Sequence, residues 1–499
     1  MNAIIPAERR SLGRIGPWRF ASRRAVLATS LAGLISAASA AGAVAQEADP
    51  TLLHDANGLK VRWHLQVALN AVAETNLFWD LGEFAAPTSG FDSDTQWLES
   101  YAKPGLSVQK SLGKATTLTG KVTGVASYTL GTDAFDRSDT GRITLEEAHL
   151  RLSTTFASGV AAEFSAGAQE VSFGSGMLIS KGGSSGFERG SLKLGPHRAW
   201  QMAALAKVSG RGATGTAFYL DANEMASNES GNRLAGVDFR LDGKTGGYVG
   251  STYARVVASR APYPKAAPGG VGPPLVEPGA RDDLNAWNVY ARTNAFTGTL
   301  KNLFLTADLA YEWNGRIDLR AWAGRAQAGY TFAGAPGAPT VTYGLQVFSG
   351  DDPKTARLER FDPLYYDGAP SGWATGSKSA MMFINSNVSA HNVTLRVAPT
   401  RKDVITFRYA HVRASELRSP VQFGQATRLD LTDEVGAVIS GVTNAHLSDD
   451  GFIEYFRVIN RHTFLTAGFS MARPGKGITA VAGLDPVWTG GFVNVVFNF

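Results

Sequence analysis

The 499-residue chain has no cysteine, and beyond residue 45 no stretch stays apolar for the roughly 18 residues that a membrane-spanning helix needs. Without cysteine, the chain can form no disulfide, no thiolate metal site and no cysteine nucleophile. Without a long apolar run, it can cross a membrane only on strands, whose alternating faces escape hydropathy scans. The mean hydropathy of -0.08 is therefore compatible with a membrane location.

The chain also has no net charge when residues 1–45 are left out of the count. Residues 1–24 contain six Arg, an apolar run follows from Ala25 to Ala38, and small residues lead to Ala45. This order predicts a secretory signal, residues 1–45, that is cleaved after export. The whole chain has 48 Lys and Arg against 43 Asp and Glu, and removing residues 1–45 leaves 42 of each sign. The basic isoelectric point therefore gives no reason to expect a nucleic-acid partner.

What the chain has in abundance is strand-like alternation. In the last ten residues, Gly490 to Phe499, Val493 and Val495 share one face, while Asn494 and Asn498 share the other. A period of two predicts a strand. One apolar face and one partly polar face suit the closing strand of a barrel that meets lipid outside and water inside.

About eighteen such segments follow one another, an even number of the kind expected of outer-membrane barrels. They lie near residues 61–70, 97–110, 115–128, 143–156, 159–172, 198–208, 213–221, 234–242, 247–258, 285–297, 302–313, 320–332, 340–349, 390–398, 404–413, 452–459, 463–471 and 490–499.

The connections between these segments alternate between short turns and long loops, apart from one short connection near 314–319. This sorting predicts an all-β transmembrane antiparallel up-and-down barrel over residues 46–499, with short periplasmic turns and long extracellular loops. The Gly- and Pro-rich loop from Ser259 to Arg281 either folds inward and narrows the pore or stays outside as a mobile loop.

Charged side chains on the strands are assigned to the lumen, because Arg or Lys facing the bilayer midplane costs about 2–4 kcal/mol. The residues predicted to line the pore are Arg62, Lys121, Glu147, Arg151, Asp238, Arg240, Arg292, Asp308, Glu312, Arg325, Arg396 and Arg408. The surplus of Arg favours anions, since guanidinium groups remain charged and pair with carboxylate or phosphate. The alternative is that these charges pair across strands and only stiffen the wall.

Several other patterns do not predict a site. Glu146 and Glu147 are adjacent, so regular alternation places them on opposite faces of a strand. The eight His show no metal-ligand spacing, and the acidic pairs Asp351-Asp352 and Asp449-Asp450 lack the spaced oxygen ligands of a calcium loop. Ser175 lies between two glycines without the sequence context of a catalytic nucleophile. No catalytic set, metal or cofactor is expected.

Two stretches resemble a known family. GAQEVSFGSGML, from Gly167 to Leu178, is similar to a motif of the alginate-export family of outer-membrane proteins, and FSGDDP, from Phe348 to Pro353, follows that family's C-terminal half. The residues that carry the resemblance are Gln169, Glu170, Gly174, Gly176, Gly350, Asp351, Asp352, Pro353, Phe361, Pro363, Asn387 and Glu454. The resemblance implies a barrel of about eighteen strands with a basic pore that exports an anionic polysaccharide. Ala168 and Met177 stand where the family pattern has Arg, and Ser175 stands where it has Asp.

These observations together predict a passive channel in the bacterial outer membrane. The lipid bilayer would surround it, an anionic exopolysaccharide or small organic anion would be its substrate, and periplasmic proteins would be its export partners. The first alternative is a diffusion porin for the uptake of small organic molecules. An outer-membrane enzyme such as a lipid hydrolase, or an adhesive barrel that works through its loops, are the others.

Overall fold

The computed structural model describes residues 49–81, 90–183, 186–227, 229–366, 383–421, 427–430, 437–482 and 485–499. The predicted signal, residues 1–45, lies outside the described residues. The chain divides into two units, and the second, Thr51–Phe499, contains every helix and strand described below.

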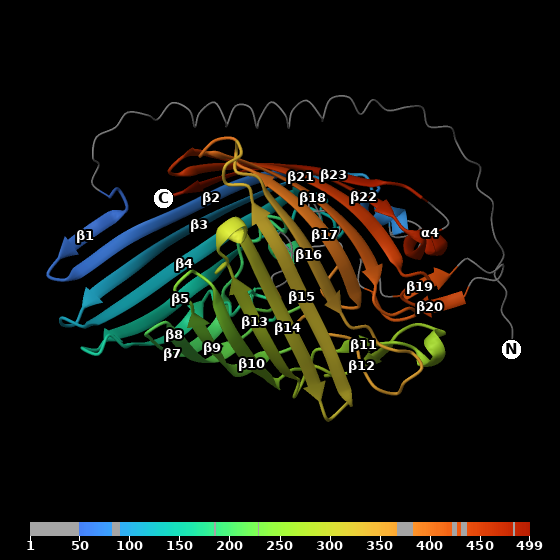
Figure 1. The fold of residues 1–499 in the computed structure, drawn as a ribbon, viewed down its shortest axis with the longest axis horizontal. Coiled ribbons are helices and arrows are strands. Elements are labelled where there is room, and N and C mark those ends of the chain that lie inside the picture. Colours follow the sequence, from blue (N-terminus) through green and yellow to red (C-terminus); the bar gives the residue numbers. More distant parts are fainter. Residues whose placement is uncertain are drawn as a thin grey trace. The chain divides into compact units, whose positions relative to one another are not determined.

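One antiparallel sheet closes on itself to form a barrel (Figure 1). The sheet has 19 strands, and β2 pairs with both β3 and β23, which joins the first strand of the barrel to the last. β1 (Leu52–Ala56) pairs only with the part of β2 that β23 does not reach, so the closed ring has one strand fewer than the sheet. The predicted fold class is confirmed, and each of the predicted segments corresponds to one barrel strand.

The barrel strands are β2 (Leu59–Thr75), β3 (Thr95–Ser111), β4 (Thr116–Gly131), β5 (Gly141–Thr155), β6 (Ala161–Gln169), β7 (Trp200–Gly210), β8 (Ala213–Asp221), β9 (Arg233–Asp242), β10 (Tyr248–Ala258), β13 (Asn285–Thr293), β14 (Leu303–Asn314), β15 (Leu319–Thr331), β16 (Thr340–Phe348), β17 (Val388–Val397), β18 (Asp403–Ala414), β21 (His446–Asn460), β22 (Thr463–Pro474) and β23 (Trp488–Asn498). The connections contain η1 (Leu77–Asp80), α3 (Gly186–Arg189), β11 (Tyr263–Lys265), η2 (Pro268–Gly270), β12 (Leu275–Glu277), η3 (Gly298–Leu300), β19 (Thr427–Asp430), β20 (Ala437–Ser440) and α4 (Lys476–Ala482).

Alternation along each strand separates an outer face from an inner one. In β18, Ala410 and Val412 are buried inside the barrel. Tyr409, which lies next to Ala410 in the same strand, points outward and is 49% exposed. Large apolar side chains are exposed all round the outer face, for example Leu150 at 62% and Leu309 at 65%. A continuous exposed apolar band of this kind belongs in lipid, and closure of the sheet pairs the backbone groups that lipid cannot solvate. The barrel therefore spans a membrane on its strands.

No helix among the described residues has the length and apolar character needed to cross a membrane.

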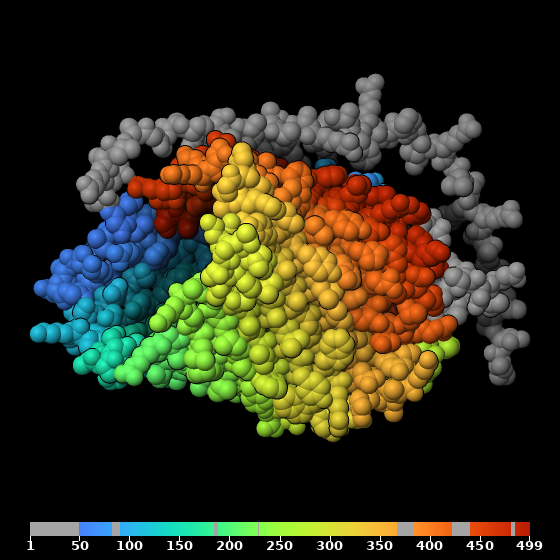
Figure 2. All heavy atoms as spheres, viewed as in Figure 1, coloured from blue at the N-terminus to red at the C-terminus, as the bar shows by residue number. Residues whose placement is uncertain are grey.

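The short and long connections lie at opposite ends of the barrel, as the sequence predicts. α4, β19–β20 and β11–β12 belong to long connections at one end, and the turns after β3 and β5 lie at the other (Figure 1). The connection between β14 and β15, residues 315–318, is the short exception that the sequence also shows. Figure 2 shows the surface hollowed between the blue segments of β2 to β4 and the yellow-green segment that contains η3, toward the end with the short turns.

The end with the long connections is filled from within. Inward side chains of β2, β17, β18 and β23 pack with η1 and α4 in one buried cluster that contains Trp79, Ile478 and Trp488. Inward side chains of β7 to β10 and β13 to β16 pack with the connections after β6 and β16 in a second cluster that contains Met177 and Phe361. The long connections thus supply a folded plug to that half of the barrel.

Candidate functional site

Alternation of faces places all twelve predicted pore-lining residues on inner-face positions of the strands. Several have partners on that face: Lys121 lies 2.7 Å from Glu147, and Asp238 accepts hydrogen bonds from the hydroxyl groups of Thr252 and Tyr290 at 2.6 and 3.0 Å. The Arg292 guanidinium lies 4.8 Å from the centroid of the Phe304 ring, which belongs to the same inner face of the neighbouring strand.

The acidic and basic members of this set differ in exposure. The four acids are all buried; their exposed fractions are Glu147 5%, Asp238 8%, Asp308 3% and Glu312 0%. Of the eight bases, only Arg325 and Arg408 are buried. The solvent-accessible part of the inner wall is therefore more basic than a count of its charges suggests.

Ion pairing removes part of this basic surplus. Arg151 lies 3.4 Å from Glu163, and Arg240 lies 2.6 Å from Asp242, so these bases are matched by acids on the wall. Exposed pairs of this kind are held only weakly.

On the half of the inner face nearest the short turns, three of the described basic side chains have no ion-pair partner. Within the described part of the chain, Lys207 in β7, Arg292 in β13 and Arg396 in β17 make no ion pair, and they come from strands well separated around the ring. The sequence analysis did not predict Lys207 as a pore-lining residue. The alternation of β7 would have indicated it, because Lys207 follows the inward residues Ala203 and Leu205 at a spacing of two. Arg142 of β5, which also makes no ion pair among the described residues, lies on the inner face nearer the long connections.

The buried cations instead bind neighbouring side chains of the wall and the plug. Arg325 lies 3.7 Å from Asp308, and both bind the hydroxyl of Ser175 in the β6–β7 connection: Arg325 donates to Ser175 at 2.8 Å, and Ser175 donates to Asp308 at 2.7 Å. Arg408 donates to the side-chain oxygen of Asn392 at 2.9 Å. Each of these side chains is inside the barrel but is covered, so it acts on the packing of the wall and plug.

The described residues of the β6–β7 connection, 170–183 and 186–199, reach from one side of the lumen to the other. Near its start, Gly174 has a φ of +58° and lies so close to Tyr290 of β13 that a Cβ would approach the ring to 2.8 Å. Near its end, the backbone N–H groups of Lys193 and Leu194 donate to the Glu99 carboxylate of β3 at 2.8 and 2.9 Å. Since β13 and β3 are far apart in the ring, this connection obstructs the passage between them.

Lys193 is a basic residue of this connection inside the barrel. Its Nζ atom is buried without a hydrogen-bond partner and lies 4.5 Å from the Phe492 ring centroid. Burial lowers the pKa of Lys193 to about 8, against the opposing effect of the carboxylates of Glu74, Glu99 and Glu454. The ammonium group is therefore held by the field of several acids and by the face of an aromatic ring.

The described residues of the β16–β17 connection, 349–366 and 383–387, form the other large part of the plug. The Asp362 carboxylate accepts two hydrogen bonds from Arg281, both 2.7 Å long, and its backbone N–H donates to Glu312 at 2.8 Å. The Tyr263 hydroxyl donates to the carbonyl of Phe361. The Ser259–Arg281 loop is therefore packed against this connection, so of the two alternatives the structure agrees with the inward fold.

The residues that carry the family resemblance mostly build this plug. A Cβ on Gly350 would lie 2.1 Å from the side-chain oxygen of Asn387, so only glycine fits there. Asn387 Nδ2 donates to the carbonyls of Glu416, Ser419 and Pro420. Asp351 accepts hydrogen bonds from two backbone N–H groups, of Ala266 and Glu359, at 2.7 Å each.

The other residues of the resemblance lie at or near the inner wall. Gln169 is 2% exposed and Phe361 0% exposed, while Glu170 pairs with Lys103 at 3.0 Å. Met177, which stands where the family pattern has Arg, is completely buried and accepts a weak contact from Asn288. An apolar core side chain therefore occupies a position at which the family pattern would bring a cation.

One prediction about faces is wrong. Thr123 of β4 faces Glu147, but Gly124 faces Leu145, so Glu146 is the extra residue of a β-bulge. Both Glu146 and Glu147 consequently point into the barrel, and they are 0% and 5% exposed. Glu146 accepts hydrogen bonds from the backbone N–H groups of Arg198 and Ala199, at 2.6 and 2.9 Å, and so docks the end of the β6–β7 connection.

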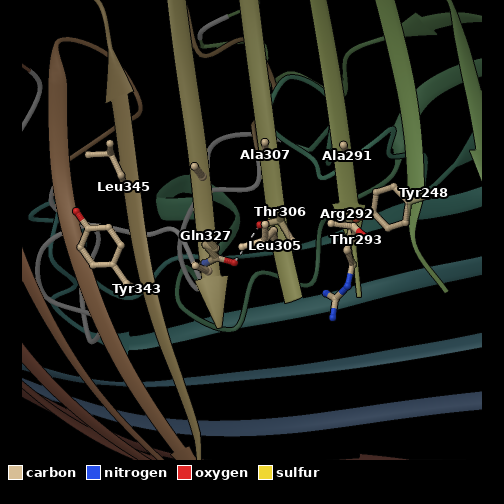
Figure 3. A pocket seen from close by; sticks show the side chains of 12 residues that line it. Tyr248, Ala291, Arg292, Thr293, Leu305, Thr306, Ala307, Gln327, Tyr343 and Leu345 are labelled. Carbon is tan, nitrogen blue, oxygen red and sulfur yellow. Dashed lines mark hydrogen bonds between the residues drawn. The ribbon is translucent and has the colours of Figure 1, made fainter. Parts of the chain in front are cut away.

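An apolar groove of about 620 Å³ lies on the opposite, lipid-facing side of the wall (Figure 3). Small side chains at Ala291 and Ala307 form its floor, with Leu345 and Tyr343 beside them. Thr306 of β14 and Gln327 of β15, whose side chains hydrogen-bond at 3.5 Å, belong to the inner face of the wall. The groove therefore follows from small residues on the outer face and is separate from the lumen.

No protein-family model matches the chain, and no match was found among curated proteins. The resemblance to the alginate-export family therefore stays a prediction.

Solved barrels are similar in structure at low sequence identity. Pseudomonas aeruginosa OccK5 (OpdH) is 9% identical over 88% of this chain and 98% of its own, with a TM-score of 0.48. Acinetobacter baumannii OccAB3 is 10% identical over 88% of this chain and 99% of its own, with a TM-score of 0.48. An anion-selective porin from Comamonas acidovorans is 10% identical over 88% of this chain and 100% of its own, with a TM-score of 0.40. The fold assignment made above rests on the strand pairings.

Proposed function

We propose that this protein is a passive channel of the bacterial outer membrane that favours anionic solutes. The observation that carries the proposal is the charge of the solvent-accessible inner wall. Lys207, Arg292 and Arg396 face the lumen without an ion pair among the described residues, whereas the acids predicted to line the pore are buried. Fixed cations around a water-filled passage raise the local concentration of anions and lower that of cations.

The location follows from the same architecture. A closed barrel with an apolar outer band, short turns at one end and long loops at the other is the form that outer-membrane proteins take. The predicted signal peptide supports export to that membrane, with the short turns on the periplasmic side and the long connections outside.

The substrate class that the motifs support is an anionic polysaccharide, moved outward with the help of periplasmic partners. The spacing of unpaired cations on β7, β13 and β17 suits this substrate, because a polyanion held at several weak sites can move from one to the next. The uptake of small organic anions by diffusion uses the same wall and remains the alternative. Enzymatic and adhesive roles receive no support from the inner wall.

Ion selectivity in planar bilayers tests the channel. The triple variant Lys207→Gln, Arg292→Gln, Arg396→Gln should lose most of the wild-type preference for chloride over potassium in a steep KCl gradient. The matched control is Arg320→Gln, Arg413→Gln, Arg473→Gln, which removes three cations from outer-face positions and should keep the wild-type reversal potential. Equal selectivity in all three proteins would refute the role of the inner wall.

The substrate class is tested by current block. A polyuronate chain added on the short-turn side should interrupt the current in discrete events, and the inner-wall triple variant should shorten those events. If small dicarboxylates reduce the current and the polymer has no effect, the channel serves small anions.

A further inference from the structure

Three metal-ligating side chains meet on the outer face of the barrel, away from the lumen. The Nδ1 atom of His411 in β18 lies 2.8 Å from Oδ1 of Asp449 in β21, and Nε2 of His446 lies 3.0 Å from Oδ2 of the same carboxylate. All the ligand atoms of the three side chains lie within 4.8 Å of one another, and no other such group occurs among the residues that the structure describes. No metal-ligand spacing in the sequence pointed to these histidines.

A β-bulge creates this cluster. Val412 faces Ser448, but Arg413 faces His446, so Leu447 is an extra residue in β21. In a regular strand, residues three apart lie on opposite faces. Here Leu447 and Ser448 are both buried inside, and His446 and Asp449 both face outward.

The cluster lies where the outer face changes from apolar to polar. Phe407 and Tyr409, which precede His411 on the outer face of β18, are 45% and 49% exposed. Toward the long connections the same face continues with His411 and Arg413. The side chains of His411, His446 and Asp449 are about one-third exposed, so ions from the water at the membrane boundary can reach them.

We propose that His411, His446 and Asp449 form a binding site for a divalent transition-metal ion of the zinc class. Two imidazole nitrogens and one carboxylate are ligands that Zn²⁺, Cu²⁺ and Ni²⁺ accept, and three protein ligands leave positions open for water. Two ligand atoms bound to one ion at 2.0–2.1 Å lie about 3.0–3.4 Å apart, so the separations of 2.8 and 3.0 Å need only small side-chain movements.

The arrangement of the rings supports a shared ion. The imidazoles of His411 and His446 are stacked, with centroids 4.7 Å apart and an angle of 26° between planes, and both turn a nitrogen toward Asp449. The Tyr409 hydroxyl donates to the same carboxylate at 2.6 Å and so fixes its orientation. A bound ion joins β18 to the start of β21 and thereby fixes the base of the long connection between them.

The groups around the site set its dependence on pH. In the strand register, Arg413 faces His446, Arg473 faces Asp449, and His391 faces His411. The two arginines stand on the outer face beside the ligands, and the His391 ring and the Tyr343 hydroxyl are hydrogen-bonded at 2.7 Å. Metal binding requires the ligand imidazoles to be deprotonated, so affinity falls on acidification.

Zinc binding to the detergent-solubilised full-length protein tests the site. After removal of metal with a chelator, calorimetric titration with ZnCl₂ at pH 7.5 should show one ion bound per chain. His446→Gln and Asp449→Asn should each weaken binding at least about tenfold. With Cu²⁺ as the probe, electron paramagnetic resonance should show coupling to two imidazole nitrogens in the wild type and to one in His446→Gln.

The control variant is His391→Gln, which removes an outward histidine one strand away and should bind zinc as the wild type does. The barrel of each variant is checked by its heat-dependent shift in gel mobility, so that loss of binding is read only on folded protein. The proposal fails if the folded wild type binds no zinc, if the His446→Gln variant binds it equally well, or if His391→Gln abolishes binding.

Discussion

At the scale of single residues, the fold uses acids and bases on the inner wall for different purposes. Glu99 and Glu146 each accept hydrogen bonds from two consecutive backbone N–H groups of the β6–β7 connection. A carboxylate does this well because it accepts several charge-assisted hydrogen bonds at once. The acids are thus occupied in docking the plug, and cations such as Arg396 are left facing the solvent.

The carboxyl group of Asp133, in the connection between β4 and β5, makes stability depend on pH. Its Oδ1 atom accepts hydrogen bonds from the N–H groups of Phe135 and Arg137, while its other oxygen is buried without a partner. Burial raises the pKa of Asp133 from 3.8 to about 6, against the effect of those two hydrogen bonds. Because the folded pKa is above the unfolded one, this group's stabilising contribution is present below pH 3.8 and is lost as pH rises through about 6.

Asp133→Asn should therefore stabilise the barrel at neutral pH and change little at pH 4. The difference in unfolding free energy between variant and wild type should grow by about 1–3 kcal/mol between pH 4 and pH 7. Urea unfolding in lipid vesicles, followed by tryptophan fluorescence, measures it. Asp136→Asn in the same connection is the control, since Asp136 is exposed, and a pH-independent difference for Asp133→Asn would contradict the argument.

At the scale of strands and loops, the sequence shows the strands but not where their alternation breaks. Alternation is local, so every barrel strand was readable from its own residues. The bulges at Glu146 and Leu447 are defined by the partner strand, because only the pairing of β4 with β5 and of β18 with β21 shows which residue is extra. For that reason the inward pair of glutamates and the outward His–Asp–His cluster could not be predicted.

The plug could not be predicted from the sequence for a related reason. Its contacts join residues far apart along the chain, as Ser175 and Arg325 show, or Tyr263 and Phe361. Composition shows that the Ser259–Arg281 loop is rich in glycine and proline, but it does not show which loops turn inward. Which loops turn inward decides which charges of the wall are exposed. The sequence could therefore assign Arg325 to the inner face without showing that the plug covers it.

Replacing residues 171–199 by a short Gly-Ser linker should raise the single-channel conductance several-fold, since this segment crosses the lumen between β13 and β3. Anion preference should persist, because Lys207, Arg292 and Arg396 remain in place. Bilayer recordings on refolded protein with the normal heat-dependent mobility measure both quantities. An unchanged conductance would show that residues 171–199 do not limit the passage.

At the scale of the whole barrel, stability depends on one pairing between the ends of the chain. β23 pairs with β2 from Gln66↔Asn498 to Thr75↔Thr489, and on its other side it pairs with β22. Every other joint of the ring links two barrel strands with no further barrel strand between them in the sequence, so this joint alone must wait until the rest of the sheet exists. In lipid, an open edge leaves backbone N–H and C=O groups unpaired at a cost of several kcal/mol each.

Removal of residues 488–499 should therefore prevent formation of the barrel. The truncated chain would expose the edges of β2 and β22 and would lose the buried Trp488, whose indole donates to Glu74 at 2.6 Å. We expect aggregation, no heat-dependent shift in gel mobility and no channel activity. Removal of residues 49–56 is the matched control: β1 pairs outside the closed ring, so this variant should fold and conduct. A folded, conducting barrel without residues 488–499 would show that closure by β23 is dispensable.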